Sequence, residues 1–163
     1  MVIKSKIEKA LNKQINVELG AFYSYLSMAA YFGSHHMTGF AAWYKVQSNE
    51  EFKHAMRLYE YIISRGGIVV LTSIEAPQEQ WKSFLSVFES AYAQELTVTG
   101  QIHDLINLAR SEGDYATEIM LQWFITEQVE EENTAKNNVE NFKFIKNTTE
   151  GVVVFDHELG QRK

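Results

Sequence analysis

The sequence predicts an all-α protein in which four long helices form a bundle, a long crossover joins the second helix to the third, and a short fifth helix follows. The first observation behind this prediction is the helical spacing of apolar residues, which dominates on both sides of the only proline, Pro77. The second is the connection at residues 66–77, whose β-branched residues favour an extended chain over a helix. A chain of 163 residues can bury a sizeable core, and we expect one domain spanning residues 1–163.

The first two helices are predicted at residues 5–32 and 40–65. A short break at residues 33–39 separates them, and short connections favour antiparallel neighbours in a bundle. Gly66 and Gly67 stop the second helix, because glycine readily takes the left-handed conformation that ends helices. The apolar stripe of the first helix consists of Leu11, Ile15, Leu19, Phe22, Leu26 and Ala29.

The remaining three helices are predicted at residues 79–109, 114–145 and 148–160. Asp114 is a favourable N-cap for the fourth helix. Asn147 and Glu150 have the spacing of a capping box for the fifth helix. The connection before the third helix is long enough to travel the length of a bundle, so the second and third helices could run parallel.

Composition and charge narrow the classes of function. A formal net charge of −6 argues against nucleic acid as a partner, because phosphate binding needs a basic surface, whereas an acidic chain attracts cations. The absence of cysteine excludes disulfides, thiolate zinc sites and iron–sulfur centres. The N-terminal residues do not resemble a signal peptide, and no apolar run approaches the ~18 residues of a membrane span. We therefore expect a cytoplasmic protein without a membrane partner.

A repeated spacing of metal-binding side chains is the most informative feature of the chain. Each half contains a glutamate followed 33 residues later by a pair of ligand-type residues at positions i and i+3. These residues are Glu18, Glu51 and His54 in the first half, and Glu95, Gln128 and Glu131 in the second. Positions i and i+3 share a helix face, so two such helix pairs would direct all six side chains into one bundle core. The spacing predicts a dinuclear metal site.

Each piece of this pattern has an ordinary explanation when it is taken alone. A single Glu-x-x-His quartet on a helix usually lies on a solvated face. Four converging carboxylates are different, because an unpaired buried charge costs several kcal/mol against a total stability of about 5–15 kcal/mol. Converging glutamates must therefore hold metal or protons. The matched interval favours convergence over four separate solvated faces.

The donor set also limits the metal. Oxygen-rich ligands with one imidazole suit Fe(II), Mn(II) or Zn(II), and the ligands alone do not choose among these ions. A single histidine with bridging carboxylates leaves open positions for O₂, which favours redox chemistry over a structural role. Glu51, in the centre of the constellation, is the natural bridge between two ions about 3.5–4 Å apart.

This ligand set resembles the ferroxidase centre of the non-haem ferritins of bacteria and archaea, and the resemblance covers the whole chain. It implies a ferritin-like bundle that assembles into a hollow homo-oligomeric shell of twenty-four subunits, where Fe(II) is oxidised by O₂ or H₂O₂ and stored as a ferric mineral. It also implies that one iron is held by Glu18, Glu51 and His54, and the second by Glu51, Glu95 and Glu131, with Gln128 beside it.

The same resemblance assigns roles to neighbouring residues. Tyr25 matches a tyrosine that forms a hydrogen bond near the centre and can supply an electron, and Trp123 matches an aromatic residue that does likewise. Ordinary core packing is the alternative for both. A third iron site is implied at Glu50, Glu127 and Glu130, for which the alternative is a solvated acidic patch.

Two relatives of this bundle do not fit the sequence. Bacterioferritins carry a second Glu-x-x-His quartet and a haem-ligating methionine, whereas here the second quartet ends at Glu131 and Phe52 follows Glu51, so we expect no haem. Rubrerythrins add a cysteine-rich iron module, which this chain lacks. Two alternative functions stay open: a ferritin-like di-metal oxidoreductase of the peroxidase or catalase type without storage, and a structural shell with an idle site.

Overall fold

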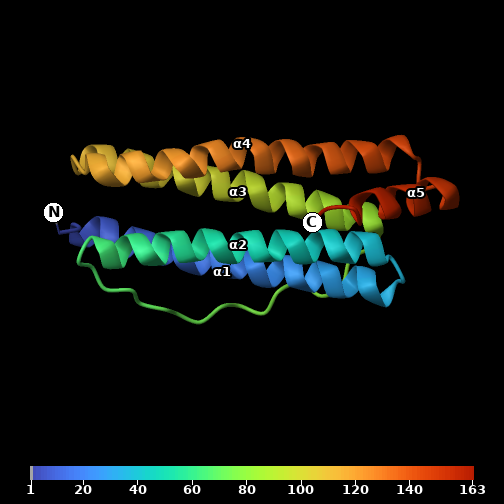
Figure 1. Ribbon diagram of the computed structural model, residues 1–163, viewed down its shortest axis with the longest axis horizontal. Helices are drawn as coiled ribbons and strands as arrows, with labels where there is room; N and C mark the ends of the chain where they lie inside the picture. The colour runs from blue at the N-terminus through green and yellow to red at the C-terminus, as the bar shows by residue number, and fades with distance from the viewer. Residues whose placement is uncertain (1) are drawn as a thin grey trace.

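The structure is a computed structural model that describes residues 2–163, and these residues form five helices and no strand. The helices are α1 (Ser5–Ser34), α2 (Thr38–Ser64), α3 (Phe84–Ser111), α4 (Tyr115–Phe144) and α5 (Thr149–Leu159). In the elongated bundle α1 lies beside α2 and α3 beside α4, while α5 folds back against the start of α2 (Figure 1). Helices α2 and α3 run in the same direction, and the crossover between them passes along the outside of the bundle (Figure 1). The predicted all-α bundle with a long crossover and a short fifth helix is confirmed.

Helix α3 begins later than the sequence predicts. It starts at Phe84 and not near residue 79, because Ser83 provides the N-cap. The Ser83 hydroxyl accepts a hydrogen bond from the Ser86 backbone N–H at 3.1 Å, and the Ser86 hydroxyl accepts one from the Ser83 N–H at the same distance. This reciprocal pair satisfies two backbone donors that would otherwise be free at the helix start. The crossover consequently extends over residues 65–83.

The capping box expected from Asn147 and Glu150 is wrong. Asn147 has a φ of 53°, in the left-handed region, so it belongs to the turn that ends α4 and cannot supply the extended conformation of an N-cap. Thr148 caps α5 in its place, and its hydroxyl accepts a hydrogen bond from the Gly151 N–H at 3.2 Å. The expected cap of α4 is confirmed, since the Asp114 side chain accepts a hydrogen bond from the backbone of the first turn.

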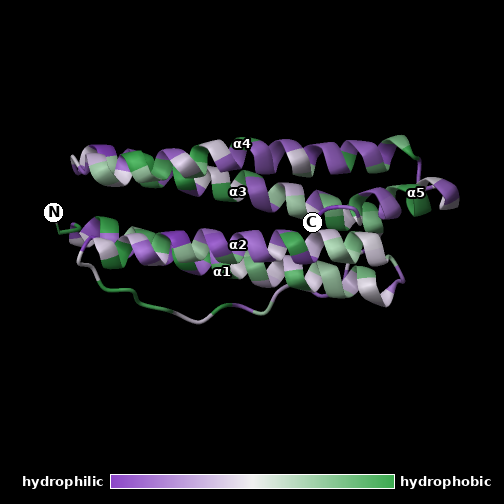
Figure 2. Cartoon of the chain, in the orientation of Figure 1, coloured by the Kyte–Doolittle hydropathy of each residue, from purple (hydrophilic) through white to green (hydrophobic). Residues whose placement is uncertain are grey.

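Side chains of α1 form hydrogen bonds with the extended backbone of the crossover and so hold it against the bundle. Asn12 donates to the Ile68 carbonyl at 2.9 Å and accepts from the Val70 N–H at 2.7 Å. The crossover remains apolar over its first part, as Figure 2 shows, and Ile68 and Leu71 expose 69% and 63% of their surface. Gly66 leads into it with a φ of 68°, a conformation that ends α2 as the sequence predicts.

A polar layer divides the apolar core into two clusters. The aromatic cluster lies at the α5 end of the bundle and includes Phe32, Phe40, Tyr44, Phe88, Phe142 and Phe155. The aliphatic cluster lies at the opposite end and includes Ile7, Leu11, Ile15, Leu58, Ile62, Ile102 and Leu121. Each helix has an apolar face and a polar face, and no helix in residues 2–163 has both the length and the apolar character of a membrane span.

Helix α5 joins the aromatic cluster and also completes the start of α2. Val152 and Phe155 are buried against the bundle. The carboxylate of Asp156 accepts hydrogen bonds from the Gly39 N–H at 3.1 Å and the Phe40 N–H at 2.7 Å, because the residue at the N-cap of α2 offers no side-chain acceptor. A Cβ at Gly39 would lie 1.7 Å from the Asp156 carbonyl oxygen, so the close approach of the two helices requires glycine there.

Candidate metal centre

The six residues of the repeated pattern meet in the polar layer between the two apolar clusters. One side chain comes from α1, two from α2, one from α3 and two from α4, in the order Glu18, Glu51, His54, Glu95, Gln128 and Glu131. All of them are buried except Glu131, which is partly exposed at the edge of the layer. The helical periodicity of each segment places them there, since each lies on the face that carries the apolar residues of its helix.

Two groups of three ligands share Glu51. In the first group, atoms of Glu18, Glu51 and His54 all lie within 4.8 Å of one another, and in the second the same holds for Glu51, Glu95 and Glu131. These are the two ligand sets that the sequence resemblance implies. Within the first group the His54 Nδ1 atom lies 3.2 Å from the Glu51 carboxylate. The arrangement can hold two cations with one carboxylate in common.

Two buried glutamines hold the carboxylates of the layer in place. Gln14 donates to Glu18 Oε1 at 2.8 Å, while Gln47 donates to Glu51 at 3.2 Å and to Glu131 at 2.7 Å. Sequence reasoning missed both, although each glutamine precedes a ligand glutamate by four residues and so shares its helix face. The second oxygen of Glu18 has no hydrogen-bond partner among residues 2–163. A buried acceptor without a donor is a position that a cation fits.

Tyr25 and Gln128 both donate hydrogen bonds to Glu95. The Tyr25 hydroxyl contacts the Glu95 carboxylate directly, and the Gln128 amide nitrogen lies 3.3 Å from the other carboxylate oxygen. The same amide nitrogen lies 3.1 Å from the Thr99 hydroxyl. Gln128 therefore presents a donor to Glu95 and orients that carboxylate.

Burial raises the pKa of every carboxyl group in the layer. The pKa of Glu18 rises to about 8, first because it is desolvated and second because the Glu51 charge lies nearby. The pKa of Glu131 rises to about 7, again through burial and then through Glu95. Burial likewise raises the pKa of Glu51 and of Glu95. Without a cation, these groups bind protons more readily than free carboxyl groups do, and a bound cation would replace a proton on any of its ligands.

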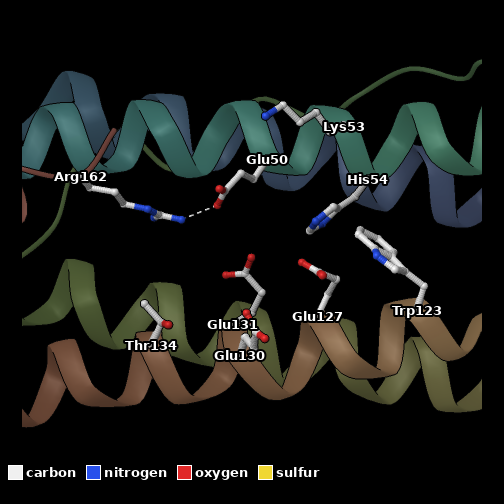
Figure 3. A pocket seen from close by; sticks show the side chains of 9 residues that line it. All are labelled: Glu50, Lys53, His54, Trp123, Glu127, Glu130, Glu131, Thr134 and Arg162. Atoms are coloured by element: carbon white, nitrogen blue, oxygen red, sulfur yellow. Dashed lines mark hydrogen bonds and ion pairs between the residues drawn. The ribbon is translucent and has the colours of Figure 1, made fainter.

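An acidic cavity opens beside the layer. It has a volume of about 280 Å³ and lies between α2 and α4, where Glu50 and His54 face Glu127 and Glu131 (Figure 3). Lys53, the neighbouring base on α2, points away from these carboxylates (Figure 3). Because the cavity reaches His54 and Glu131, it connects the polar layer to the outside of the subunit.

The third site implied by the sequence is only partly assembled. Glu127 forms a group with His54 and Glu131, whose ligand atoms lie within 4.8 Å of one another. Glu50 and Glu130 line the same cavity but belong to no such group among residues 2–163. Glu130 is exposed, and Glu50 forms an ion pair with the guanidinium of a residue near the C-terminus, which no sequence pattern indicates.

Trp123 closes the side of the cavity next to His54. The centroids of the two rings are 5.5 Å apart and the rings meet edge to face. The guanidinium carbon of Arg57, three residues after His54 on α2, lies 4.1 Å from the Trp123 ring centroid, at a distance typical of cation–π contacts. Trp123 thus contacts a ligand-type histidine and a surface arginine, and both core packing and a redox role are compatible with that position.

Comparisons with known proteins identify the family of the chain. Residues 8–145 match the family model for ferritin, described as a ferritin-like domain. The chain is 37% identical over 161 residues to the bacterial non-heme ferritin of Staphylococcus epidermidis, covering 99% of this chain and 97% of that one, and 39% identical to that of Bacteroides fragilis, covering 99% and 100%. The fold matches an open-pore ferritin from the archaeon Archaeoglobus fulgidus with a TM-score of 0.98 and 43% identity, covering 99% of both chains. The chain belongs to the ferritin family.

Proposed function

We propose that the protein is an iron-storage ferritin with ferroxidase activity, in which Fe(II) is oxidised by O₂ inside each subunit and the ferric product is stored in a hollow shell. The observation that carries this proposal is the pair of ligand groups that share Glu51. Two Fe(II) ions in adjacent groups can each give one electron to the same O₂ molecule. The O₂ takes up two electrons and two protons and leaves as hydrogen peroxide.

In this proposal the residues of the polar layer bind the two iron ions as follows. Glu18 and His54 hold one iron, Glu95 and Glu131 hold the other, and Glu51 contacts both. Their combined negative charge favours Fe(III) over Fe(II) and so assists the oxidation. Carboxyl groups whose pKa is raised by burial release any proton they hold when iron binds, which would provide protons for the reduction of O₂.

Neighbouring residues support the reaction in different ways. Tyr25 donates a hydrogen bond to Glu95, and in the proposed reaction its phenol can supply an electron to the centre. Gln128 orients Glu95 from the other side. Glu50, Glu127 and Glu130 form an outer site for a third iron, which the cavity connects to the inner pair. Trp123 lies at the boundary between the two regions.

Assembly into a homo-oligomeric shell of 24 subunits in the cytoplasm is part of the proposal. Large apolar side chains on the surface support it. They include Ile68, Leu71, Tyr115, Ile119 and Phe144, and Phe144 exposes 86% of its surface. Contacts between subunits would remove such side chains from water, which stabilises an assembly.

The proposal is tested by removing one ligand at a time. We expect Glu51→Ala and His54→Ala each to slow rapid Fe(II) oxidation by more than about 100-fold, because even the loss of an outer-shell partner costs about 10–100-fold. Stopped-flow absorbance of the ferric product measures the rate, and size-exclusion chromatography checks that the shell is intact. Glu60→Ala is the matched control, since Glu60 is exposed on the same helix. An unchanged initial rate in either ligand variant would reject the assignment.

A ferritin-like di-metal oxidoreductase of the peroxidase or catalase type is not favoured, because the relatives with full coverage bear ferritin names. The two functions differ in a simple observable. A storage protein forms a large particle that retains many iron atoms per subunit after aerobic loading with Fe(II). A small oligomer that retains only about two ions per subunit, the capacity of one dinuclear site, would support the alternative.

A further inference from the structure

The C-terminal tail of the chain reaches the acidic cavity. The guanidinium of Arg162 forms an ion pair with the Glu50 carboxylate, as Figure 3 shows. Its other amino group donates to the side-chain oxygen of Gln47 at 2.8 Å. The guanidinium carbon also lies 4.8 Å from the Trp43 ring centroid. Three residues of α2 therefore bind one arginine.

The anchoring of α5 places Arg162 on this face of α2. Asp156 binds the first turn of α2, and a Cβ at Gly160 would lie 2.9 Å from the Gly39 Cα atom, so the end of α5 is packed tightly against α2. The tail leaves this contact next to the start of α2. The three residues that bind Arg162 follow at helical positions i, i+4 and i+7, which share one face of the helix. The position of the tail is thus fixed by backbone contacts as well as by charge.

Arg162 neutralises a carboxylate that the third iron would need. Arginine stays protonated at every pH at which a protein is folded, so its charge is permanent. While the guanidinium is bound to Glu50, a metal ion at that carboxylate meets both a positive charge and an occupied oxygen. An ion that uses the same Glu50 oxygen must therefore displace Arg162, and an ion on the other oxygen is repelled by its charge.

Arg162 has the opposite relation to the inner layer. It donates to the oxygen of Gln47, whose amide nitrogen donates to Glu51 and to Glu131. A flipped amide would turn its nitrogen toward the guanidinium and its oxygen toward two carboxylates, so the contact with Arg162 fixes the orientation of Gln47. The inner carboxylates keep their donor while Arg162 is in place.

We propose that Arg162 is a tethered cation that competes with metal for Glu50 and thereby weakens binding at the outer site relative to the inner pair. This inference rests on the proposed function, because it takes the outer cavity as the third iron site. The competition predicts the order in which the three ions bind, with the inner pair first. The inner pair binds where no cationic side chain is bound to its carboxylates, whereas the outer ion competes with Arg162 for Glu50.

Calorimetric titration of the assembled, metal-free protein with Zn²⁺ tests the competition without redox chemistry. We expect Arg162→Gln to tighten the weakest of three binding steps by roughly fivefold, the value of a partly exposed ion pair, and to change the two tighter steps by less than about twofold. Lys163→Gln is the matched control. It removes the same charge at the next position in the chain, and the Lys163 side chain forms no ion pair within residues 2–163. An unchanged weakest step in Arg162→Gln, or an equal change in Lys163→Gln, would overturn the proposal.

A double-mutant cycle separates direct competition from a general loss of positive charge. In a Glu50→Gln background, Arg162→Gln should leave the weakest step unchanged, since the guanidinium has no carboxylate to release. Continued tightening in that background would overturn the proposal. The proposed function fails in a different way, because it requires the two tight steps to be present in the wild type and lost in Glu51→Ala.

Discussion

Replacing Glu18 by glutamine isolates the effect of burying a carboxyl group in the polar layer. Glu18 is 0% exposed, and only one of its oxygens has a donor, Gln14, among the described residues. Glutamine has nearly the same shape and keeps an oxygen for this hydrogen bond, but it does not ionise. Glu18→Gln therefore removes a buried charge with little change in packing.

The size of the effect follows from the pKa of Glu18, which rises from 4.5 to about 8 on folding. Because the pKa of Glu18 is raised in the folded state, protonated Glu18 contributes to stability. This contribution is fully present below about pH 4.5 and is lost as the pH rises through about 8. The whole shift corresponds to an upper limit of about 5 kcal/mol. If less than half of this free energy, about 2 kcal/mol, is lost from the stability of the wild type, the Glu18→Gln protein should have a Tm about 4–8 °C above that of the wild type near pH 8.5.

Scanning calorimetry of the metal-free shells at about pH 5 and pH 8.5 measures this difference, with one scan rate throughout because large assemblies often unfold irreversibly. Glu60→Gln, an exposed glutamate on α2, is the control for a change of charge alone. Zn²⁺ should stabilise the wild type more than the variant, since it binds only the folded ligands. A gap in Tm that is equal at the two pH values would show that burial of Glu18 is not its source. Equal stabilisation by Zn²⁺ would mean that the ions bind elsewhere.

Two further substitutions test the anchoring of α5 and the role of the tyrosine. Gly39→Ala should lower the Tm by several degrees and disturb the C-terminal tail, because its Cβ would clash with the Asp156 carbonyl; Gly100→Ala, whose Cβ would meet nothing within 4 Å, should not lower it. A Gly39→Ala protein that melts with the wild type would contradict this account of the helix contact. Tyr25→Phe should keep both inner Zn²⁺ ions in calorimetry but slow Fe(II) oxidation by about tenfold, the equivalent of one charged hydrogen bond. Loss of an ion would make Tyr25 a structural residue, and an unchanged rate would remove it from the reaction.

The helices and the convergence of the ligand-type residues follow from local spacing. An apolar residue at every third or fourth position defines the inner face of each helix, so Glu18 and Glu95 could be placed on inner faces from their neighbours alone. Glu51 and His54 then share a face because they are three residues apart. Asp114 could be recognised as a cap because it precedes a helical pattern directly. Each of these inferences needs only a few consecutive residues.

Features that depend on competition or on distant contacts were not predictable in this way. Thr148 is a cap because of the turn that precedes it, and no composition rule ranks Ser83 or Thr148 above nearby polar residues. Gln47 could have been found from its position four residues before Glu51. The contact of Arg162 with Glu50 joins residues 112 positions apart and depends on how α5 packs, so no local pattern contains it.

The division of the core into an aromatic and an aliphatic cluster separates the information for folding from the information for chemistry. Each cluster contains residues from all four long helices, so the bundle can close on both sides of the polar layer without any contribution from the layer itself. Side chains in the layer can then be exchanged for other metal ligands at a modest loss of packing. The same scaffold can in this way acquire a different metal preference, or none, through a handful of substitutions that leave its shape unchanged.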